Sequence, residues 1–556
     1  MPEPSPASFS ASVDGAVLMR HMQGFARWIK LSGTDDEMQS LEAVRASLAG
    51  YGLSTTILRH DALISLPGRS RVAFGNATPP SITHSFSRSS PPEGVTAALV
   101  DVGEGTAAEF AAVDARGRIV LVDGIASPAI AHRAKAAGAI GQLHVSPHEH
   151  LHEMCVSPIW GSPSPLTVDA LPATIVNTIA AADGAAIRAS LASGASPQVT
   201  LFAEVDTGWR KTPILVAELY PADAPPDAPF VMFSGHHDTW YYGVMDNGGA
   251  NATMLEVARL AALHRDALRR GLRLCFWSGH SHGRYSGSAW YADEHWAELD
   301  ARCVAHINVD STGGAGATVL ANSAAMPELA PLVAEALAAE AGTNYVGRPM
   351  DRSSDQSFWG VGLPSALGTL SEQPPGPVKL RNRLGWWWHT PHDTLEHIDE
   401  ANLVRDTRVF AHLLWRLLAA PLPPLDYTAW SAALVRELAD LQRALGARLD
   451  LAPLIAAAEA LGKAAARLAS LPPARATALL TRLSRILVPL HTLSGDRFSH
   501  DPALPQPPWP PVASLRALAA LPPASDEAFP AMVAARRARN RLAHALGEAN
   551  RLLAQA

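Results

Sequence analysis

Long apolar runs alternate with amphipathic stretches through the middle of the chain. Apolar residues fill the first parts of segments 229–238, 273–282 and 303–314, whereas residues 251–268 place apolar side chains at helical spacing. Buried strands that alternate with helices are typical of a mostly parallel sheet with helices on both faces. We therefore predict an α/β fold built on a doubly wound, mostly parallel sheet.

The flanking segments follow different patterns. Residues 17–52 show apolar positions at helical spacing and a glycine-rich stop, which predicts two helices. From residue 67 the chain changes to short β-rich runs and a small-residue helix, which predicts a compact mixed α/β insert. Beyond residue 425 it is almost entirely Ala-, Leu- and Arg-rich helix, interrupted by the proline-rich stretch 500–512. The predicted units are residues 1–66 as an N-terminal part of the domain 208–424, the insert 67–207 and a helical domain 425–556.

Composition narrows the class of protein. The chain has 556 residues, 48% of them hydrophobic and 17% charged, with a formal net charge of −7, which fits a globular protein that does not bind nucleic acid. Its cysteines, at 155, 275 and 303, are too widely spaced for a disulfide framework. The N-terminus lacks the features of an export signal, and no uncharged apolar run approaches the ~18 residues that span a bilayer. We expect a cytoplasmic protein with no membrane partner.

Metal-binding residue types cluster where the predicted strands end. His236 and Asp238 follow the first strand, and Asp246 stands on a Gly- and Asn-rich turn that leads into a helix. A histidine offers a neutral nitrogen to a metal ion, a carboxylate two residues on can hold its other ring nitrogen, and a further carboxylate can bridge two cations. This group is therefore a candidate metal site.

Three further groups strengthen that prediction. The second strand runs into His280, Ser281 and His282, the third strand ends in Asp310, and His389 precedes a turn. Ligands bind beyond the carboxyl ends of the strands in doubly wound sheets, and burying this many ionisable groups without a metal or partners would be costly. We therefore expect these side chains to meet around metal ions.

Other candidates have a plainer alternative. The histidines between residues 144 and 152 could bind metal, but with no helix or strand to fix them we expect a solvated loop. The tryptophans at 386–388 could line an aromatic substrate pocket or pack in the core. Four arginines could bind a substrate carboxylate or simply face solvent: Arg348, Arg352, Arg381 and Arg383.

The ordered set of metal-binding residues resembles the co-catalytic zinc peptidases related to glutamate carboxypeptidase II and the transferrin receptor. The insert resembles the protease-associated domain through RGRIVLVDG, HRAKAAGAIG and LPATIVN, and the tail is similar to the helical dimerisation domain of that group. The resemblance implies two divalent ions, with zinc the first candidate and Mn or Fe the alternatives. It places one ion on His236 and Asp310, the other on His389 and one more residue, and Asp246 between the two.

The His-Ser-His stretch departs from the family. In the peptidases this strand ends in a Glu-Glu pair, the first a general base and the second a metal ligand, followed by a Gly-Ser turn. Counting back from that turn places Ser281 at the base position and His282 at the ligand position, whereas counting forward from the strand places His280 and Ser281 there. We predict His282 as the ligand, because the turn fixes the local geometry, and His280 as the base. The candidate catalytic residues are His280, Ser281 and Asp238.

The resemblance implies a metal-dependent hydrolase that cleaves an amide or related C–N bond in a small or peptide-like substrate by metal-bound hydroxide. One alternative is a metal-dependent lyase or another non-peptidase C–N cleavage, because the glutamate base is missing. Another is a non-catalytic binding protein like the transferrin receptor, although such a protein has no reason to keep the metal residues. The tail implies a homodimer, and its last helix carries an apolar stripe of Val533, Leu542, Leu546, Leu552 and Leu553.

Overall fold

One twisted sheet runs through the computed structural model, which describes residues 4–193, 197–376 and 383–555. Its strands are β1 (Ser54–Phe74), β2 (Ser81–Thr83), β3 (Val95–Asp101), β4 (Ile119–Asp123), β5 (Gly141–Val145), β6 (Ile175–Ile179), β7 (Gln198–Leu219), β8 (Phe230–His236), β9 (Gly271–Trp277), β10 (Cys303–Asp310) and β11 (Ser365–Thr369). Within the described ranges their order is β11-β10-β8-β9-β7-β3-β4-β5-β6-β2, and β1 pairs with β7.

The strands predicted in the middle of the chain form the parallel part of this sheet. β11, β10, β8 and β9 lie side by side in parallel, and β7 joins them antiparallel to β9. Alternate residues of β8 enter two separate cores, since Val231 and Phe233 belong to one cluster and Phe230 and Met232 to another. The sheet is therefore buried on both faces, and the predicted α/β class with a doubly wound sheet is confirmed.

Helices cover both faces of this half. Leu18, Met22 and Phe410 pack in the larger cluster with Phe233, whereas Tyr291 and Leu299 pack in the smaller cluster with Phe230. The helices on the larger-cluster side are α1 (Pro6–Ser10), α2 (Gly15–Phe25), α3 (Asp35–Gly50), α7 (Ala250–Leu263), α10 (Ala330–Ala341) and α11 (Glu400–Ala419). Those of the smaller cluster are α8 (Ser286–Glu294) and α9 (Trp296–Arg302).

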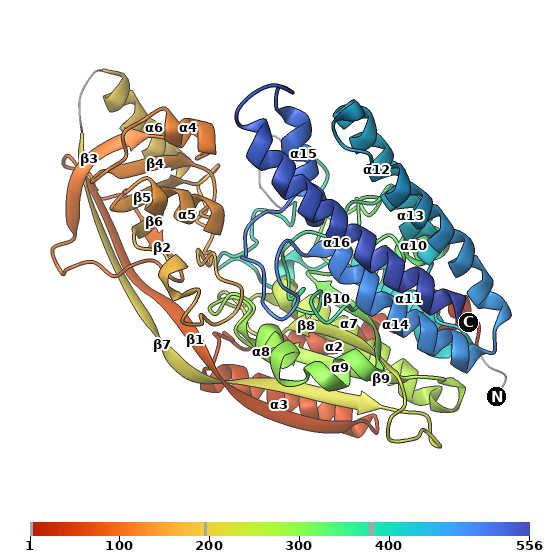
Figure 1. Cartoon of the computed structure of the whole chain (residues 1–556). Helices are drawn as coiled ribbons and strands as arrows, with labels where there is room; N and C mark the ends of the chain where they lie inside the picture. The colour runs from red at the N-terminus through yellow and green to blue at the C-terminus, as the bar shows by residue number, and fades with distance from the viewer. Residues whose placement is uncertain (1–3, 194–196, 377–382, 556) are drawn as a thin grey trace.

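The two longest strands carry the sheet into the insert, seen at the upper left of Figure 1. β1 and β7 pair antiparallel along most of their length, with a register irregularity between Pro67 and Ser70. The predicted boundaries at residues 67 and 207 therefore fall inside one continuous ribbon. The insert has its own core, which includes Leu121 and Leu143. Its helices are α4 (Ala107–Ala111), α5 (Pro128–Ala136) and α6 (Ala181–Ala192).

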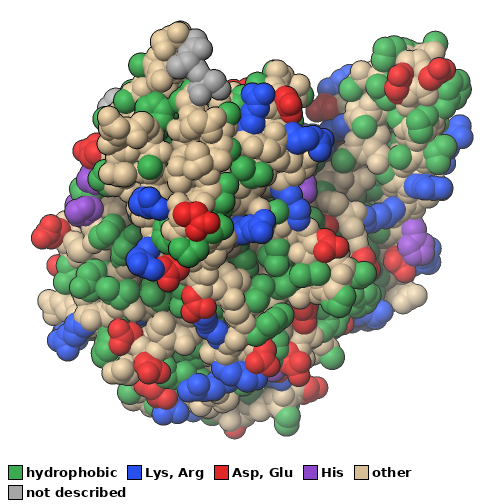
Figure 2. Space-filling model, turned by 90° about the vertical axis from the view of Figure 1, so that its left-hand side faces the viewer, with side chains coloured by type: hydrophobic (Ala, Val, Ile, Leu, Met, Phe, Trp, Pro, Cys, Tyr) green, Lys and Arg blue, Asp and Glu red, His purple; other side chains and the backbone are tan. Residues whose placement is uncertain are grey.

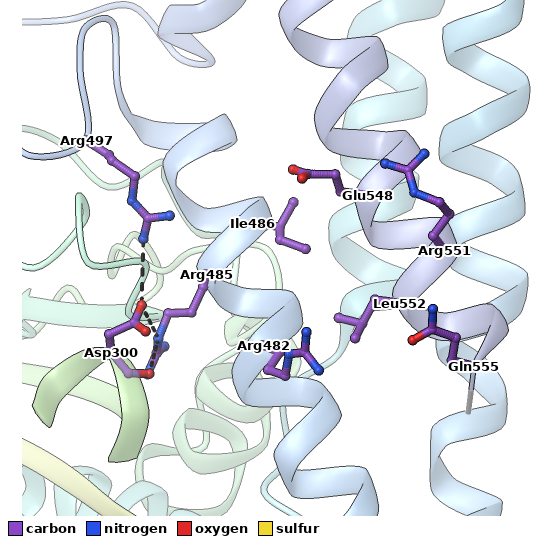
Figure 3. A pocket seen from close by; sticks show the side chains of 9 residues that line it. All are labelled: Asp300, Arg482, Arg485, Ile486, Arg497, Glu548, Arg551, Leu552 and Gln555. Atoms are coloured by element: carbon purple, nitrogen blue, oxygen red, sulfur yellow. Dashed lines mark hydrogen bonds and ion pairs between the residues drawn. The ribbon is translucent and has the colours of Figure 1, made fainter. Parts of the chain in front are cut away.

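The helical tail shares one hydrophobic cluster with the half of the molecule that holds the parallel strands (Figure 1). Its helices are α12 (Tyr427–Leu445), α13 (Ala452–Ala465), α14 (Pro473–Thr492), α15 (Ala513–Ala520) and α16 (Ala528–Ala554). Arg485 of α14 is buried and donates hydrogen bonds to the backbone carbonyls of Leu299, Asp300, Gly362 and Cys303 at 2.6–3.0 Å. Figure 3 shows this arginine and Asp300 beside a cavity of about 460 Å³ between α14 and α16. The buried side chain of Arg485 thus links the tail to the backbone around α9 and the start of β10.

The apolar stripe of α16 is largely covered by its own chain. Leu542, Leu546, Leu552 and Leu553 are buried, whereas Val533 is 47% exposed. On the face drawn in Figure 2, acidic and basic side chains are interspersed. None of the helices within the described ranges has both the length and the apolar character needed to cross a bilayer.

Candidate active site

The carboxyl ends of three neighbouring parallel strands bring the predicted residues together. β8 ends at His236, β10 ends at Asp310, and the loop that carries His280 follows β9. Asp246 lies on the turn before α7. This arrangement is the one expected for a doubly wound sheet, in which ligands bind beyond the carboxyl ends of the strands.

Asp246 lies between two histidines and offers one oxygen to each. Its Oδ1 is 3.1 Å from His236 Nε2, and its Oδ2 is 3.1 Å from His389 Nε2. Asp310 approaches from the side, with Oδ1 3.5 Å from His236 Nε2. Ser354 donates a hydrogen bond to Asp310 Oδ2. A carboxylate between two imidazoles is the arrangement of a bridging ligand.

Backbone carbonyls fix the orientation of both histidines. His236 Nδ1 donates to the carbonyl oxygen of Asp238 at 2.7 Å, and His389 Nδ1 donates to that of Glu153 at 2.7 Å. Each ring therefore directs Nε2 toward the carboxylates. The carboxylate of Asp238 was predicted to hold the other ring nitrogen of His236, but the backbone carbonyl of Asp238 is the acceptor instead, and the carboxylate Oδ1 lies 3.9 Å away.

The side chain of Asp238 supports the His-Ser-His loop. It accepts hydrogen bonds from the backbone N–H of His280 at 3.3 Å and of Ser281 at 2.9 Å, and from Ser32 Oγ at 2.5 Å. Ser281 Oγ is buried and makes no hydrogen bond within the described part of the chain. The loop is thus held from the N-terminal segment as well as from β8.

The two histidines of this loop have different surroundings. His280 Nδ1 is 2.7 Å from Asp355 Oδ2, and its ring stacks on that of His236 with centroids 3.7 Å apart. Ligand-type atoms of His280, His236 and Asp310 all lie within 4.8 Å of one another. His282 Nδ1 instead lies 3.0 Å from Ser32 Oγ. Within the described residues His282 belongs to no such group of three.

Electrostatics set Asp246 apart as a buried, ionised carboxylate. Burial alone would raise the pKa of Asp246, but hydrogen bonds and charges from His236 and His389 hold it well below its usual value. Burial would lower the pKa of His236, but Asp246 and Asp310 outweigh it and raise that pKa well above the usual value. Burial, with the neighbouring His389 and His280, lowers the pKa of His282 to about 3. The buried carboxylates therefore stabilise positive charge at the site.

A cavity of about 650 Å³ opens onto these side chains. Its wall includes Trp240, Arg284 and Trp388, and Trp388 stacks on His389 with ring centroids 3.4 Å apart. All three parts of the chain contribute, because the insert supplies residues 125 and 127–129 and the tail supplies residues 503–505. The insert and the tail therefore each form part of the cavity wall.

The candidate arginines and tryptophans divide between cavity and core. Arg348, Arg352 and Arg383 line the cavity, whereas Arg381 lies outside the described residues. Trp388 faces the cavity; Trp387 is buried and stacks on His397 with centroids 4.2 Å apart.

The expected solvated histidine loop is wrong for most of its members. His144, His148 and His152 are buried. His148 Nε2 lies 2.8 Å from His152 Nε2, and His152 Nδ1 lies 2.5 Å from the carbonyl oxygen of Trp388. These rings pack between the insert and the segment before His389, a tertiary contact that local sequence does not reveal.

Several residues of the site carried no signal in the sequence. Asp355 and Ser354 lie in a loop outside every predicted element, and both adopt positive φ, of 52° and 48°. Ser32 comes from the N-terminal segment. Trp240 packs against His282 and His389, with ring centroids 4.2 and 5.6 Å away. The sequence pattern at strand ends predicts candidate ligands that lie on strands. It does not predict the side chains that reach the site from loops distant in the sequence.

Comparison with known proteins supports the predicted relationship. Residues 215–414 match the family described as Peptidase family M28. The probable glutamate carboxypeptidase LAMP1 of Arabidopsis thaliana is 26% identical over 255 residues, 42% of this chain and 37% of the relative. The aminopeptidase NAALADL1 of Mus musculus is 24% identical over 277 residues, 43% of this chain and 37% of the relative. The matches thus span about a third of the length of these curated relatives.

Solved structures share the fold. The aminopeptidase from Aneurinibacillus sp. strain AM-1 superposes with a TM-score of 0.56 at 20% identity, covering 74% of this chain and 96% of that one. A peptidase M28 precursor from Shewanella amazonensis gives a TM-score of 0.59 at 17% identity, covering 74% and 95%. His236, Asp246, Asp310 and His389 all lie in the matched region. The part of the chain that carries these side chains, residues 215–414, is therefore similar to peptidase family M28.

Proposed function

We propose that this protein is a metal-dependent hydrolase that cleaves an amide or related C–N bond in a small or peptide-like substrate. The observation that carries the proposal is Asp246, whose two oxygens lie 3.1 Å from His236 Nε2 and 3.1 Å from His389 Nε2. Two imidazoles around a buried carboxylate have the geometry of metal ligands. Each Nε2–oxygen contact is bridged here by a hydrogen bond, and a cation would take the place of its proton. The family match points to the same chemistry.

The donor set fits a divalent cation. Imidazole nitrogens and carboxylate oxygens are the ligands that zinc takes in catalytic sites, and the same set accepts Mn or Fe(II). His236, Asp310, Asp246 and His389 would hold the metal. A bound ion of this kind acidifies water and polarises a carbonyl. Around it, His236 and His389 are oriented by backbone carbonyls, and Asp238 fixes the loop after β9.

The cavity supports a substrate with both an aromatic or apolar part and a polar part. Trp240 and Trp388 offer flat surfaces near the site, and Arg284 lies in the same wall, with its Nε buried and not hydrogen-bonded within the described residues. N-acyl amino acids and aromatic amides combine these features. We therefore place them, with dipeptides, in the substrate panel.

The test combines metal content with turnover. Protein freed of metal and reloaded with Zn²⁺ is expected to hydrolyse at least one member of the panel, and removal of the ion by a chelator should abolish the reaction. Asp246→Asn keeps the size of the side chain but removes its charge, so we expect metal affinity and kcat/KM to fall by at least about 10²-fold. Asp266→Asn, an exposed carboxylate, is the matched control. Wild-type protein that binds no divalent ion would overturn the proposal.

We further propose a homodimer formed through the start of α16. Phe529 is 71% exposed and Val533 is 47% exposed, and residues four apart lie on the same face of a helix. The likeness of the tail to a dimerisation domain supports the same surface. The rest of the apolar stripe is buried within the chain, so on the described part of α16 the exposed large apolar side chains are those of Phe529 and Val533.

A further inference from the structure

Asp355 and His280 form a buried pair beside the metal site. His280 Nδ1 lies 2.7 Å from Asp355 Oδ2, and Asp355 Oδ1 accepts a hydrogen bond from Ser288 Oγ at 2.7 Å. Asp355 is only 1% exposed. A carboxylate can only accept hydrogen bonds, so the histidine donates from Nδ1, and the lone pair of Nε2 remains available.

His280 also lies beside His236 and Asp310, two candidate metal ligands. Its ring lies parallel to that of His236, with an interplanar angle of 13°. A ring nitrogen of each histidine and a carboxylate oxygen of Asp310 lie within 4.8 Å of one another, which one cation can span. A histidine that donates its second nitrogen to a carboxylate is the usual support of a metal-bound imidazole.

The surroundings of His389 offer fewer metal-binding atoms than the group of His236, His280 and Asp310. Asp246 Oδ2 is 3.1 Å from His389 Nε2, but no third His, Cys, Asp or Glu of the described residues joins these two atoms in a group within 4.8 Å. Ser281, the neighbour of His280, carries only a neutral hydroxyl. His282 lies with Nδ1 against Ser32 and its ring against Trp240.

We propose that His280, positioned by Asp355, is a ligand of the ion held by His236 and Asp310, and that this protein binds one divalent ion tightly rather than two. The inference rests on the proposed metal-dependent function and deepens it. The glutamate pair of the resembling peptidases is thereby replaced by one additional nitrogen on the first ion, while the second position keeps only Asp246 and His389. Asp355 is a positioning residue, because it acts through His280.

The number of ions per chain tests the first half of the proposal. Metal-free full-length protein is titrated with Co²⁺ and with Zn²⁺, dialysed, and analysed by mass spectrometry for metal content, while affinity is measured against a chromophoric chelator. We expect one ion per chain to be retained. Two ions of similar affinity would overturn the single-ion proposal, whereas no ion at all would overturn the proposed function itself.

Variants test the ligand assignment. His280→Ala should lower affinity for the ion by at least about 10²-fold, and Asp355→Asn by about 10–100-fold, with a changed visible spectrum of the Co²⁺ protein. Asp355→Glu should restore part of the affinity. His282→Ala is the matched control in the same loop and should leave metal content unchanged. Loss of the ion in His282→Ala, or unchanged affinity in His280→Ala and Asp355→Asn, would overturn the assignment.

Folding is controlled in the metal-free state. Circular dichroism and the urea midpoint of each metal-free variant are compared with those of the metal-free wild type. If His280→Ala is unfolded, His280→Gln replaces it, because the amide keeps most of the volume and one polar contact. Unchanged affinity in that variant would likewise overturn the proposal.

Discussion

Buried carboxyl groups in this protein have two kinds of surroundings. Asp246 is flanked by two imidazoles, and its pKa is held well below the usual value. Glu328 is fully buried, and both of its carboxyl oxygens lack a hydrogen bond within the described residues. Burial therefore raises the pKa of Glu328 to about 8. The partners of Asp246 therefore keep it charged, whereas Glu328 stays neutral at pH 7.

Glu328 should make stability depend on pH. Its pKa in the folded protein is about 8, compared with an ordinary value of 4.5, so the folded state binds this proton more tightly than the unfolded state. The free energy of unfolding should therefore fall as pH rises through this window, by on the order of a few kcal/mol. Glu328→Gln removes the titration: it should match the wild type near pH 5 and be more stable near pH 9.

Urea unfolding of both proteins at the two pH values measures this difference. The exposed Glu459 in α13 provides the control Glu459→Gln, which should follow the wild type at both pH values. The explanation fails if the gap between the wild type and Glu328→Gln is the same at pH 5 and pH 9.

At the scale of elements, the strand ends position the site residues, and one helix of the tail contacts the opposite side through Arg485. β8, β9 and β10 end beside one another, which brings His236, His280 and Asp310 to one edge. On the opposite side, Arg485 of α14 donates to backbone carbonyls around α9. These carbonyls lie at the end of α9 and the start of β10, where helix carbonyls lack partners within the helix. A planar guanidinium with five donors is suited to several such acceptors at once.

Arg485→Lys tests this contact. Lysine keeps the charge but has one ammonium group, so it cannot reach the same set of carbonyls, and buried acceptors remain unpaired. We expect the free energy of unfolding to fall by about 2–4 kcal/mol. Arg482→Lys, on the same helix and facing the cavity shown in Figure 3, is the control and should change stability by less than about 0.5 kcal/mol. Equal losses in the two variants would show that the carbonyl contacts do not matter.

At the scale of the whole molecule, the insert and the tail complete the site. Glu153 of the insert accepts the hydrogen bond from His389 Nδ1, and His152 contacts the carbonyl of Trp388. Residues 503–505 of the tail close another side of the cavity. The orientation of a metal-site histidine thus depends on packing between parts of the chain that are more than 200 residues apart in the sequence.

The exposed patch on α16 makes the oligomeric state testable. Wild-type protein should scatter light as a dimer of the 58.8 kDa chain at micromolar concentration. Phe529→Asp combined with Val533→Asp places two charges in the proposed contact and should give a monomer with unchanged circular dichroism. Arg436→Asp, exposed on α12 rather than α16, is the control for added negative charge and should remain dimeric if the contact is confined to the patch. A wild-type mass near that of one chain would contradict the homodimer.

The sequence by itself determined the fold class and the residues at the strand ends. Apolar runs separated by helical spacing predict the parallel strands, and the carboxyl ends of such strands must meet at one edge, which is where His236 and Asp310 lie. Only the tertiary structure gives His280 and His282 their different surroundings, because the loop after the strand is held by Asp238 and Asp355. The burial of the histidines in the insert was likewise decided by tertiary packing. Local spacing fixes the direction of side chains along a strand, but partners that arrive from distant loops are set by packing.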